Sequence, residues 1–445
     1  MNTPICDFVR QYAESNALRL HMPGHKGMSF LGFEAYDITE IAGADSLYEA
    51  NGIIAESERN ASGLFGCDTY YSTEGSSKCI RAMLYLAALY AKKKGKRPHV
   101  AALRNVHKAF LSAAALIGFE TTWIYPQKMD SYLSCKLTSD EIEYFVDKYS
   151  EKITAVYITS PDYLGNITDL QKIADICHKH DVLLLVDNAH GAYLKFLPES
   201  LHPMDFGADL CCDSAHKTFP VLTGGAYLHI SDRIAESLDE NVKNALAMFG
   251  STSPSYLILQ SLDAANRYLY EGYRKRLAEF CIKAEKCKNI LASHGYVFCG
   301  DEPLKLTICT KKYGYYGYEL LKILSDKGII CEFGDPDFLV VMLTPETDDK
   351  GLERMTEALL SIPKRPVIEE NPPVFSKPTM IMPIREAAMC PCKNIYTKDS
   401  LGEILAAANV GCPPAVPILV CGERIDENAI KCFEYYGICN LTVIR

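Results

Sequence analysis

The sequence predicts an α/β protein built on a mostly parallel sheet, and three observations support that class. Between about residues 65 and 230, apolar strand-like runs alternate with segments of helical periodicity, as in successive βαβ units. Several of these runs are continuously apolar, which is typical of strands covered on both faces. The chain has 445 residues, 48% of them hydrophobic and 23% charged, which is enough for two or three folded domains.

The clearest βαβ unit begins with a β-branched strand over residues 153–159, which ends at Ser160-Pro161. The apolar residues of the following helix recur at i, i+3, i+4 and i+7: Leu170, Ile173, Ala174 and Cys177. The continuous run Val-Leu-Leu-Leu-Val at 182–186 is then the next strand.

After residue 304 the pattern changes to that of a smaller α+β lobe. Strands are expected over 305–310, 329–333 and 338–344, with a turn at 334–337 between the last two. Six prolines between Pro363 and Pro383 indicate a linker. The expected organisation is an N-terminal arm (1–60), a large domain (61–304), a small lobe (305–362), and the linker with a C-terminal module (363–445).

Composition excludes several classes of protein. The net charge of −10 argues against a nucleic-acid-binding protein. The longest uncharged apolar run, residues 82–91, is too short to cross a bilayer, and residues 1–10 show no secretory signal. The 18 cysteines are then expected to be reduced thiols of a cytoplasmic protein. Cys390 and Cys392 lack the second pair that a zinc site requires, so no metal site is expected.

Polar residues at the carboxyl ends of the strands are the candidates for chemistry, because ligands of open parallel sheets bind there. Four such positions occur: Asp187 after 182–186, residues 213–217 after 208–212, residues 104–107 after 100–103, and residues 70–77 before a helix over 78–91. Taken singly, each has an ordinary explanation as a helix cap, a turn residue, a loop histidine or a surface lysine.

Taken together, these residues match the requirements of pyridoxal phosphate. The cofactor needs a lysine amine for its aldehyde, a carboxylate that keeps the ring nitrogen protonated, a phosphate cradle and a flat group against the ring. Lys217, Asp187 and His107 supply the amine, the carboxylate and the flat group. Ser76 and Ser77, at a helix N-terminus, suit a phosphate.

Longer motifs resemble the bacterial ornithine/lysine/arginine decarboxylases, which have the fold type I of pyridoxal-phosphate enzymes. The motifs are His21-Met-Pro-Gly-His-Lys26, Asp37-Ile-Thr-Glu40, Arg104-Asn-Val-His-Lys108, Asp187-Asn-Ala-His-Gly191, Ser214-Ala-His-Lys-Thr218, Cys412-Pro-Pro-Ala-Val-Pro417 and Gly422-Glu423. The resemblance runs from about residue 18 to 426. It is to the short form of the family, without an N-terminal flavodoxin-like wing.

The resemblance implies a role for each matching residue. Lys217 would bind the cofactor covalently, and Asp187 would pair with the ring nitrogen. His107 and Ala189 would lie on opposite faces of the ring, and His216 would serve in proton transfer. The implied phosphate contacts are Gly75, Ser76, Ser77, Ser214 and, across a dimer interface, Thr252 in the segment 251–254. Glu423 is the candidate for the cationic end of the substrate, against the alternative of an exposed glutamate.

This chain departs from the family pattern at three positions on the substrate side. Asn188 replaces a glutamate, Tyr48 replaces a histidine, and Ala415 replaces a glycine. The cofactor residues are kept, so the cofactor is predicted more firmly than the substrate.

The function that the resemblance implies is decarboxylation of arginine, lysine or ornithine to an amine of polyamine metabolism, by a cytoplasmic homodimer or larger homo-oligomer. Two alternatives stay open. One is an aminotransferase or lyase on the same fold, and the other is a non-catalytic relative. Aminotransferases of this fold usually hold the α-carboxylate with an arginine of the small lobe. Arg354 is the single arginine among residues 305–362, and it lies inside a predicted helix, which favours the decarboxylase.

Overall fold

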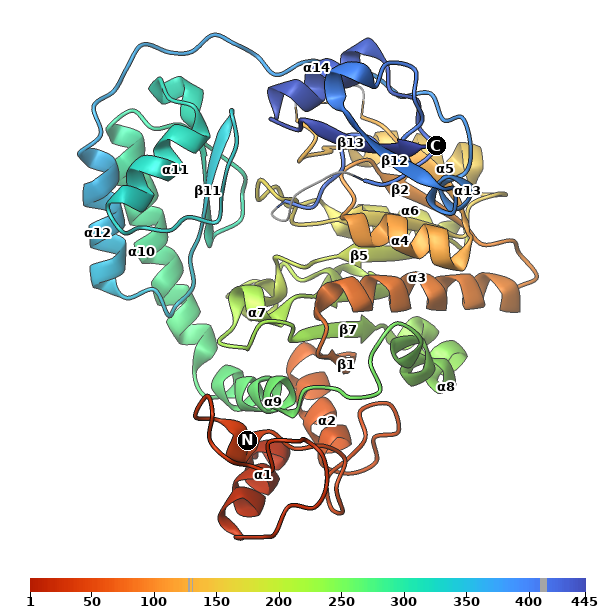
Figure 1. Cartoon of the computed structure of the whole chain (residues 1–445), viewed down its shortest axis with the longest axis vertical. Helices are drawn as coiled ribbons and strands as arrows, with labels where there is room; N and C mark the ends of the chain where they lie inside the picture. Colours follow the sequence, from red (N-terminus) through yellow and green to blue (C-terminus); the bar gives the residue numbers. More distant parts are fainter. Residues whose placement is uncertain (127–128, 130, 409–413) are drawn as a thin grey trace. The chain divides into compact units, whose positions relative to one another are not determined.

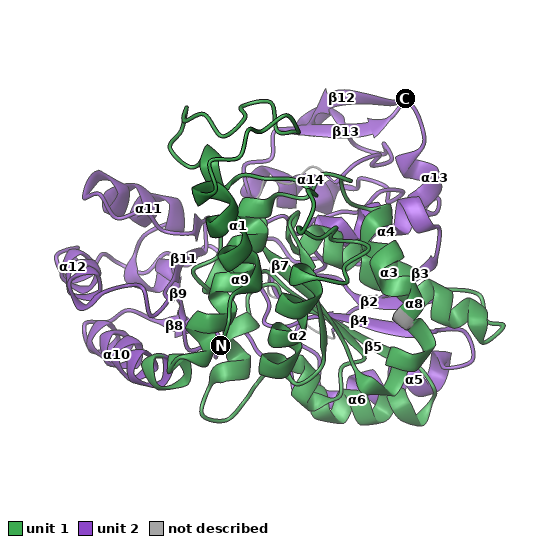
Figure 2. Ribbon diagram, turned by 90° about the horizontal axis from the view of Figure 1, so that it is seen from below, with its two compact units in different colours: residues 1–98, 170–276 green, residues 99–169, 277–445 purple. Residues whose placement is uncertain are grey.

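The structure is a computed structural model that describes residues 1–126, 129, 131–408 and 414–445. Cys412 and Pro413 of the C-terminal motif lie outside the described residues. The chain forms two units, each made of two separate stretches of sequence: unit 1 is 1–98 with 170–276, and unit 2 is 99–169 with 277–445 (Figure 2).

Unit 1 contains four neighbouring strands in the order β1 (Asp68–Ser72), β7 (Ala226–Ile230), β6 (Leu210–Asp213) and β5 (Leu183–Asp187). β5 and β6 are parallel and pair Asp187 with Cys212, whereas β7 is antiparallel to both β6 and β1. β5 and β6 therefore end side by side, at Asp187 and Asp213.

The helices of unit 1 surround these strands. They are α1 (Pro4–Glu14), α2 (Ile53–Phe65), α3 (Gly75–Lys93), α6 (Leu170–Lys179), α7 (Ala215–Thr218), α8 (Asp232–Met248) and α9 (Tyr256–Tyr270), with 3₁₀ turns η1 (Glu34–Tyr36), η2 (Ala192–Phe196) and η3 (Pro203–Phe206). Asp263 of α9 holds the N-terminal helix by accepting hydrogen bonds of 3.0 Å from the backbone N–H groups of Ile5 and Cys6. Figure 1 labels these α-helices along the chain.

Unit 2 contains three groups of strands. β4 (Ala155–Thr159), β2 (His99–Leu103) and β3 (Glu120–Ile124) are adjacent in that order and parallel. An antiparallel sheet has the order β10 (Phe333–Gly334), β11 (Phe338–Met342), β9 (Lys305–Cys309) and β8 (Phe298–Cys299). β12 (Cys392–Tyr396) pairs with β13 (Asn440–Ile444).

The helices of unit 2 are α4 (Lys108–Ile117), α5 (Ser139–Tyr149), α11 (Gly317–Asp326), α12 (Asp349–Leu360), α13 (Ile384–Ala388) and α14 (Glu427–Tyr435), with η4 (Thr310–Tyr313) and η5 (Thr397–Asp399). The boundary between the units falls within α10 (Tyr273–Ser293). One apolar core cluster of unit 2 combines Leu133 and Leu164 with Phe433 and Val443, so the end of the chain packs on its middle. Among the described helices, none combines the length and the apolar character needed to cross a membrane.

The predicted α/β class with a mostly parallel large sheet is confirmed. The predicted strands at 153–159 and 182–186 correspond to β4 and β5, and the helix between them is α6. The strand expected over 329–333 is shorter, since only Phe333 and Gly334 pair with β11. The domain boundaries expected from composition stay a prediction.

Candidate active site

Lys217 lies on α7, a single helical turn that directly follows β6. Its Nζ is 3.0 Å from Nε2 of His190, which is buried with 7% of its surface exposed. His190 comes three residues after the end of β5, and the parallel pairing of β5 and β6 brings the two loops together. The sequence motif contained His190, but its contact with Lys217 was not predicted. The contact orients the lysine amine at the strand ends.

Asp187 is the last residue of β5 and is 2% exposed. Its Oδ1 accepts a hydrogen bond of 3.2 Å from the backbone N–H of Ala189 and one of 3.7 Å from the thiol of Cys212. Ala189 is itself buried. The carboxylate therefore has a fixed orientation at the strand end, beside the segment that carries Lys217.

Ser76 and Ser214 meet at the start of α3, where a phosphate cradle was predicted. The Ser214 hydroxyl donates to the Ser76 hydroxyl at 2.7 Å. Gly75 opens the helix with φ +72°, a conformation that favours glycine, and its N–H donates to the Gly224 carbonyl at 2.7 Å. Ser77 is half-buried in the same turn. The first N–H groups of this 19-residue helix and the hydroxyls form an anion-binding corner.

His216 precedes Lys217, and its ring is anchored by the backbone. Nδ1 donates to the Gly225 carbonyl at 3.0 Å, so Nε2 is the basic nitrogen of the neutral ring. Burial and the charge of Lys217 lower the pKa of His216, although the bond to Gly225 opposes this shift. A neutral imidazole beside the lysine is suited to accept and return a proton.

A buried polar network lies directly behind these residues and was missed by the sequence analysis. Asp213 is fully buried and accepts hydrogen bonds from His202 at 3.0 Å, His229 at 3.1 Å and the Asn188 amide at 2.6 Å. Burial alone would raise the pKa of Asp213, but the two histidines lower it well below the usual range. Burial alone would lower the pKa of His229, but Asp213 outweighs burial, so the pKa of His229 is raised.

Asn188 has a defined place in this network. It follows Asp187, and Asp213 precedes Ser214, so one hydrogen bond ties the two loops of the site together. An amide can donate this bond to an ionised Asp213, whereas a carboxylate at position 188 would bring a second negative charge to it.

Tyr48, a second departure on the substrate side, and the segment around Thr252 also form contacts within unit 1. Tyr48 accepts a hydrogen bond of 2.6 Å from Nζ of the buried Lys78, whose pKa is lowered by burial. Thr252 is exposed, and its neighbour Ser251 donates its N–H to Glu74 at 2.7 Å, next to the start of α3. Contact of Thr252 with a phosphate stays a prediction.

His107 and its surroundings belong to unit 2. His107 is the N-cap of α4, and its Nδ1 accepts a hydrogen bond of 3.1 Å from the Ala109 N–H, so Nε2 carries the proton of the neutral ring. Lys108 has an exposed side chain, and its N–H donates to the carbonyl of Ala415 at 2.9 Å. Ala415 has φ +57°, a conformation that a glycine would adopt at lower cost.

Glu423 is buried, so its alternative interpretation as an exposed glutamate is wrong. Its carboxylate accepts hydrogen bonds from Arg104 at 2.8 Å and from the Val420 N–H at 2.7 Å, and both charged side chains are at most 3% exposed. Burial raises the pKa of Glu423, and Arg104 opposes this shift. Its predicted role at the substrate stays a prediction, since its charge already has a partner.

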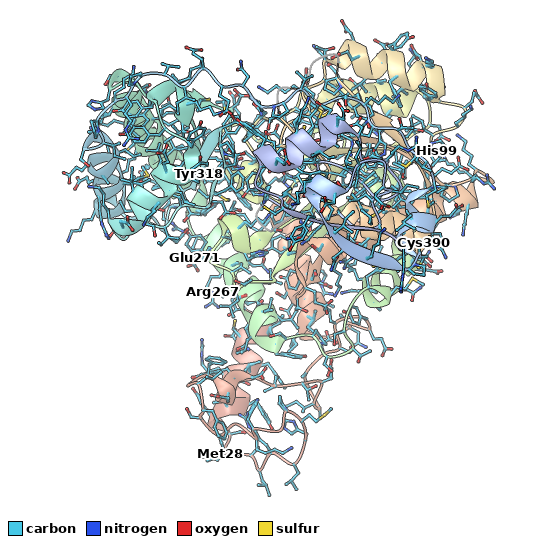
Figure 3. All side chains as sticks on the ribbon, turned by 45° about the horizontal axis from the view of Figure 1, so that its top comes forward. Met28, His99, Arg267, Glu271, Tyr318 and Cys390 are labelled. Atoms are coloured by element: carbon cyan, nitrogen blue, oxygen red, sulfur yellow. The ribbon has the colours of Figure 1, made fainter. Side chains whose placement is uncertain are left out.

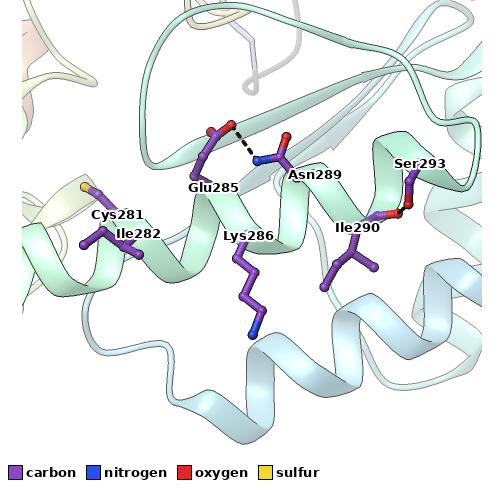
Figure 4. Close-up of a pocket in the computed structure, with 7 residues that line it drawn as sticks. All are labelled: Cys281, Ile282, Glu285, Lys286, Asn289, Ile290 and Ser293. Atoms are coloured by element: carbon purple, nitrogen blue, oxygen red, sulfur yellow. Dashed lines mark hydrogen bonds between the residues drawn. The ribbon is translucent and has the colours of Figure 1, made fainter.

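A large hollow lies elsewhere in the chain and has none of the expected chemistry. It has a volume of 690 Å³ and lies along one side of α10, between Cys281 and Ser293 (Figure 4). It contains none of the residues predicted for the site. The strand ends of unit 1 remain the candidate active site.

The residues of unit 1 fit pyridoxal phosphate. An amine, a buried carboxylate and a hydroxyl-lined helix N-terminus all follow the carboxyl ends of strands or open α3, as the cofactor requires. The fold is that of the fold type I pyridoxal-phosphate enzymes, and binding of the cofactor at this site stays a prediction.

The particular family follows from sequence comparison. The model of the Orn/Lys/Arg decarboxylase major domain matches residues 3–298, more than half of the chain. The protein therefore belongs to the Orn/Lys/Arg decarboxylase family, and the resemblance stated from the motifs is confirmed.

Similar proteins span nearly the whole chain. An arginine decarboxylase of Halalkalibacterium halodurans is 30% identical, covering 96% of this chain and 91% of the relative. An arginine decarboxylase of Bacillus subtilis is 29% identical, with coverage of 96% and 92%. Among solved structures, lysine decarboxylase A of Pseudomonas aeruginosa has a TM-score of 0.81 at 16% identity, covering 99% of this chain and 80% of that one. The lysine decarboxylase of Francisella novicida has a TM-score of 0.80 at 16% identity, covering 100% and 81%.

Proposed function

We propose that this protein uses pyridoxal phosphate to remove the α-carboxylate of a basic amino acid, with arginine as the first substrate to test. The observation that supports this most directly is the convergence of Lys217, Asp187 and Ser76 at strand ends, in a chain of the decarboxylase family. Arginine comes first because the two relatives described above, which cover almost the whole chain, carry that name.

Each residue of the site has a defined task. Ser76, Ser77 and Ser214 hold the phosphate with the N–H groups of α3, and Thr252 is assigned to the same anion. Asp187 holds a proton on the ring nitrogen, where an ionised carboxylate favours the charged form. The cofactor supplies an electron sink for the pair left when CO₂ departs.

Proton transfer is assigned to two residues of α7, Lys217 and His216. Lys217 would hold the cofactor through its amine, which His190 positions at 3.0 Å. Nε2 of His216 would first accept a proton from Lys217 or solvent, and the imidazolium so formed would deliver it to the α-carbon, since Nδ1 is fixed on Gly225. His107 and Ala189 would contact the faces of the cofactor ring, as the family resemblance implies.

Decarboxylation is favoured over transamination by the surroundings of Arg354. This residue of α12 would be the candidate to hold an α-carboxylate in an aminotransferase. Its Nη2 instead donates to the carbonyls of Lys327, at 2.7 Å, and Gly328, at 3.3 Å, which close the end of α11. Arg354 thus serves as a helix C-terminal cap.

A homodimer is proposed as the working form, and the N-terminal segment supports it. Leu18, Leu20, Phe30 and Leu31 are 76–83% exposed in the isolated chain, around the His21–Lys26 motif. Exposed apolar side chains so close together are typical of an interface. Light scattering coupled to gel filtration measures the mass directly, and a monomer at micromolar concentration would refute the dimer.

The activity is tested by incubating the cofactor-loaded protein with arginine, lysine and ornithine in parallel. Release of CO₂ with formation of the matching amine is the expected result for one of the three. Formation of a keto acid instead would identify an aminotransferase. Absence of both products, together with a lack of visible cofactor absorbance, would identify a non-catalytic relative.

A further inference from the structure

A second pocket, of 370 Å³, is built entirely from residues of unit 2 and has an unusual lining. Five of its side chains are aromatic: Tyr132, Tyr318, Phe333, Tyr435 and Tyr436. Two more, Asp335 and Glu434, are carboxylates, and none of the described lining residues is basic. Tyr318, on α11, is labelled in Figure 3. Aromatic faces and carboxylates both attract cations.

Asp335 distinguishes this pocket from an exposed cluster of carboxylates, because its side chain is buried. It is 7% exposed, and it lies in the turn between β10 and β11. Its Oδ1 accepts hydrogen bonds of 2.7 Å from the N–H groups of Asp337 and Phe338, which fixes the carboxylate in place. Its Oδ2 is buried and has no hydrogen-bond partner among the residues that the structure describes. An unpartnered buried carboxylate oxygen is costly unless a ligand completes it.

The neighbouring Asp337 differs from Asp335, because other side chains of unit 2 bond to both of its carboxylate oxygens. Its Oδ1 is 2.9 Å from Nζ of Lys311 and accepts a hydrogen bond of 2.7 Å from Tyr435. Tyr436 donates to its Oδ2 at 3.4 Å. Among the described residues, Asp335 forms no ion pair of this kind, and Lys311 acts on it only through its charge and without a direct bond. A cation in direct contact with Asp335 would then come from a ligand.

The tyrosines supply the remaining contacts for such an ion. The ring centroids of Tyr132 and Tyr436 are 4.6 Å apart and those of Tyr435 and Tyr436 are 4.9 Å apart, both edge to face. Edge-to-face pairs point their rings in different directions, so the wall that they form offers both ring faces and ring edges to a ligand in the pocket. Lys311 already uses the face of Tyr435, with Nζ 4.8 Å from the centroid.

We propose that this pocket binds a small organic cation that carries a guanidinium or primary ammonium group, with the charged group at Asp335 Oδ2 and the alkyl part against the tyrosines. The volume fits a ligand of about the size of an amino-acid side chain. This site is additional to the cofactor site of unit 1 and does not depend on the reaction that occurs there.

The pocket is tested by calorimetric titration of the cofactor-loaded protein with n-propylguanidinium and, separately, with n-propylammonium. Neither ion has a carboxylate to lose, so catalysis does not contribute. n-Propylurea, the neutral analogue of similar shape, is the ligand control. Saturable binding of at least one ion, with binding of the urea at least tenfold weaker, is the expected result. No saturable binding of either ion, or equal binding of the urea, would overturn the proposal.

The matched variants are Asp335→Asn and Glu427→Gln. The asparagine keeps an oxygen for the two backbone N–H groups and removes only the charge, whereas Glu427 is an exposed residue of α14 outside the pocket. We expect Asp335→Asn to weaken binding at least tenfold and Glu427→Gln to leave it unchanged. Equal loss in both variants would show a general charge effect and reject the site, as would full binding by Asp335→Asn.

A third variant keeps the proposal testable if Asp335→Asn does not fold. Glu434→Gln changes an exposed carboxylate at the rim and should weaken binding two- to threefold with an unaltered circular dichroism spectrum. If it binds like the wild type while Asp335→Asn is misfolded, the proposal fails. Failure of this site would leave the decarboxylase proposal untouched, because that is judged by CO₂ release.

Discussion

Nζ of Lys217 and Nε2 of His190 lie 3.0 Å apart, although 27 residues separate them in the sequence. The contact exists because β5 and β6 are parallel neighbours and both loops leave the sheet at the same edge. His190 thereby holds the lysine amine among Asp187, Ser214 and His216, the residues to which the proposed chemistry is assigned.

Lys217→Ala is the first prediction. Turnover should be abolished with the fold intact, because Lys217 is half-buried at a strand end rather than in the core. CO₂ release and circular dichroism measure the two effects. Lys108→Ala is the matched control, since Lys108 is exposed and adjoins His107. Borohydride reduction followed by peptide mapping should label Lys217, and a label on Lys108 would contradict the assignment.

The second prediction concerns Asp187→Ala. The cofactor should stay bound through its phosphate, while kcat falls by a factor that corresponds to several kcal/mol, because a neutral pyridine ring is a poorer electron sink. Cofactor retention after dialysis is read from its visible absorbance, and the rate from CO₂ release. Near-normal kinetics in this variant would show that Asp187 does not protonate the ring.

The third prediction uses the pair formed by Asn188 and Asp213. Asn188→Asp replaces a donor with a carboxylate of the same shape, so two negative charges would meet in a fully buried place. We expect a loss of stability of about 2 kcal/mol or more, together with weaker cofactor retention, because the two loops of the site separate. Asn188→Ala, which removes the bond without adding charge, should cost less. An unchanged melting temperature in Asn188→Asp would refute the network.

These contacts show what sequence can and cannot predict here. Asp187 and Lys217 were predicted because each follows an apolar run, and the carboxyl end of a buried strand is a known place for ligands. The bonds of Asp213 with His202 and His229 depend on strand register and loop packing, which no local pattern encodes.

The same limit applies to charged pairs that span the chain. Arg104 and Glu423 are 319 residues apart, and their contact depends on how the C-terminal residues pack within unit 2. Burial of Glu423 could not be read from its Gly-Glu motif, which is typical of a surface turn. Asp335 was likewise predicted only as part of a turn, and the burial of its Oδ2 without a partner among the described residues depends on how the pocket is assembled.

Glu423→Gln is the fourth prediction. The glutamine keeps an acceptor for the Val420 N–H but leaves Arg104 buried without its counter-charge, which should cost about 3–5 kcal/mol of stability. Glu403→Gln is the control, because its ion pair with Lys393 is exposed and should matter by less than about 1 kcal/mol. Chemical denaturation measures both. A raised KM with unchanged stability would instead assign Glu423 to the substrate.

The fifth prediction is a pH dependence of stability that arises at Asp335. Burial, reinforced by the charge of Asp337, raises the pKa of Asp335 to about 7, although Lys311 and two backbone hydrogen bonds lower it. Tyr132, Tyr435 and Tyr436 also surround it and stay neutral below pH 9, because burial raises the pKa of each. Glu434, at the rim of the pocket, is exposed to solvent.

Between the ordinary pKa of an aspartate and pH 7, the folded protein thus binds a proton that the unfolded chain has released. The stability that this proton retains is fully present below the ordinary pKa of an aspartate and is lost as the pH rises through about 7. At pH 8 the ionised, buried Asp335 therefore destabilises the ligand-free protein. Asp335→Asn should therefore melt at a higher temperature than the wild type at pH 8, with the difference shrinking towards pH 5. n-Propylguanidinium should remove most of the difference at pH 8 by binding the ionised wild type. A difference independent of pH would show that the folded carboxyl titrates normally.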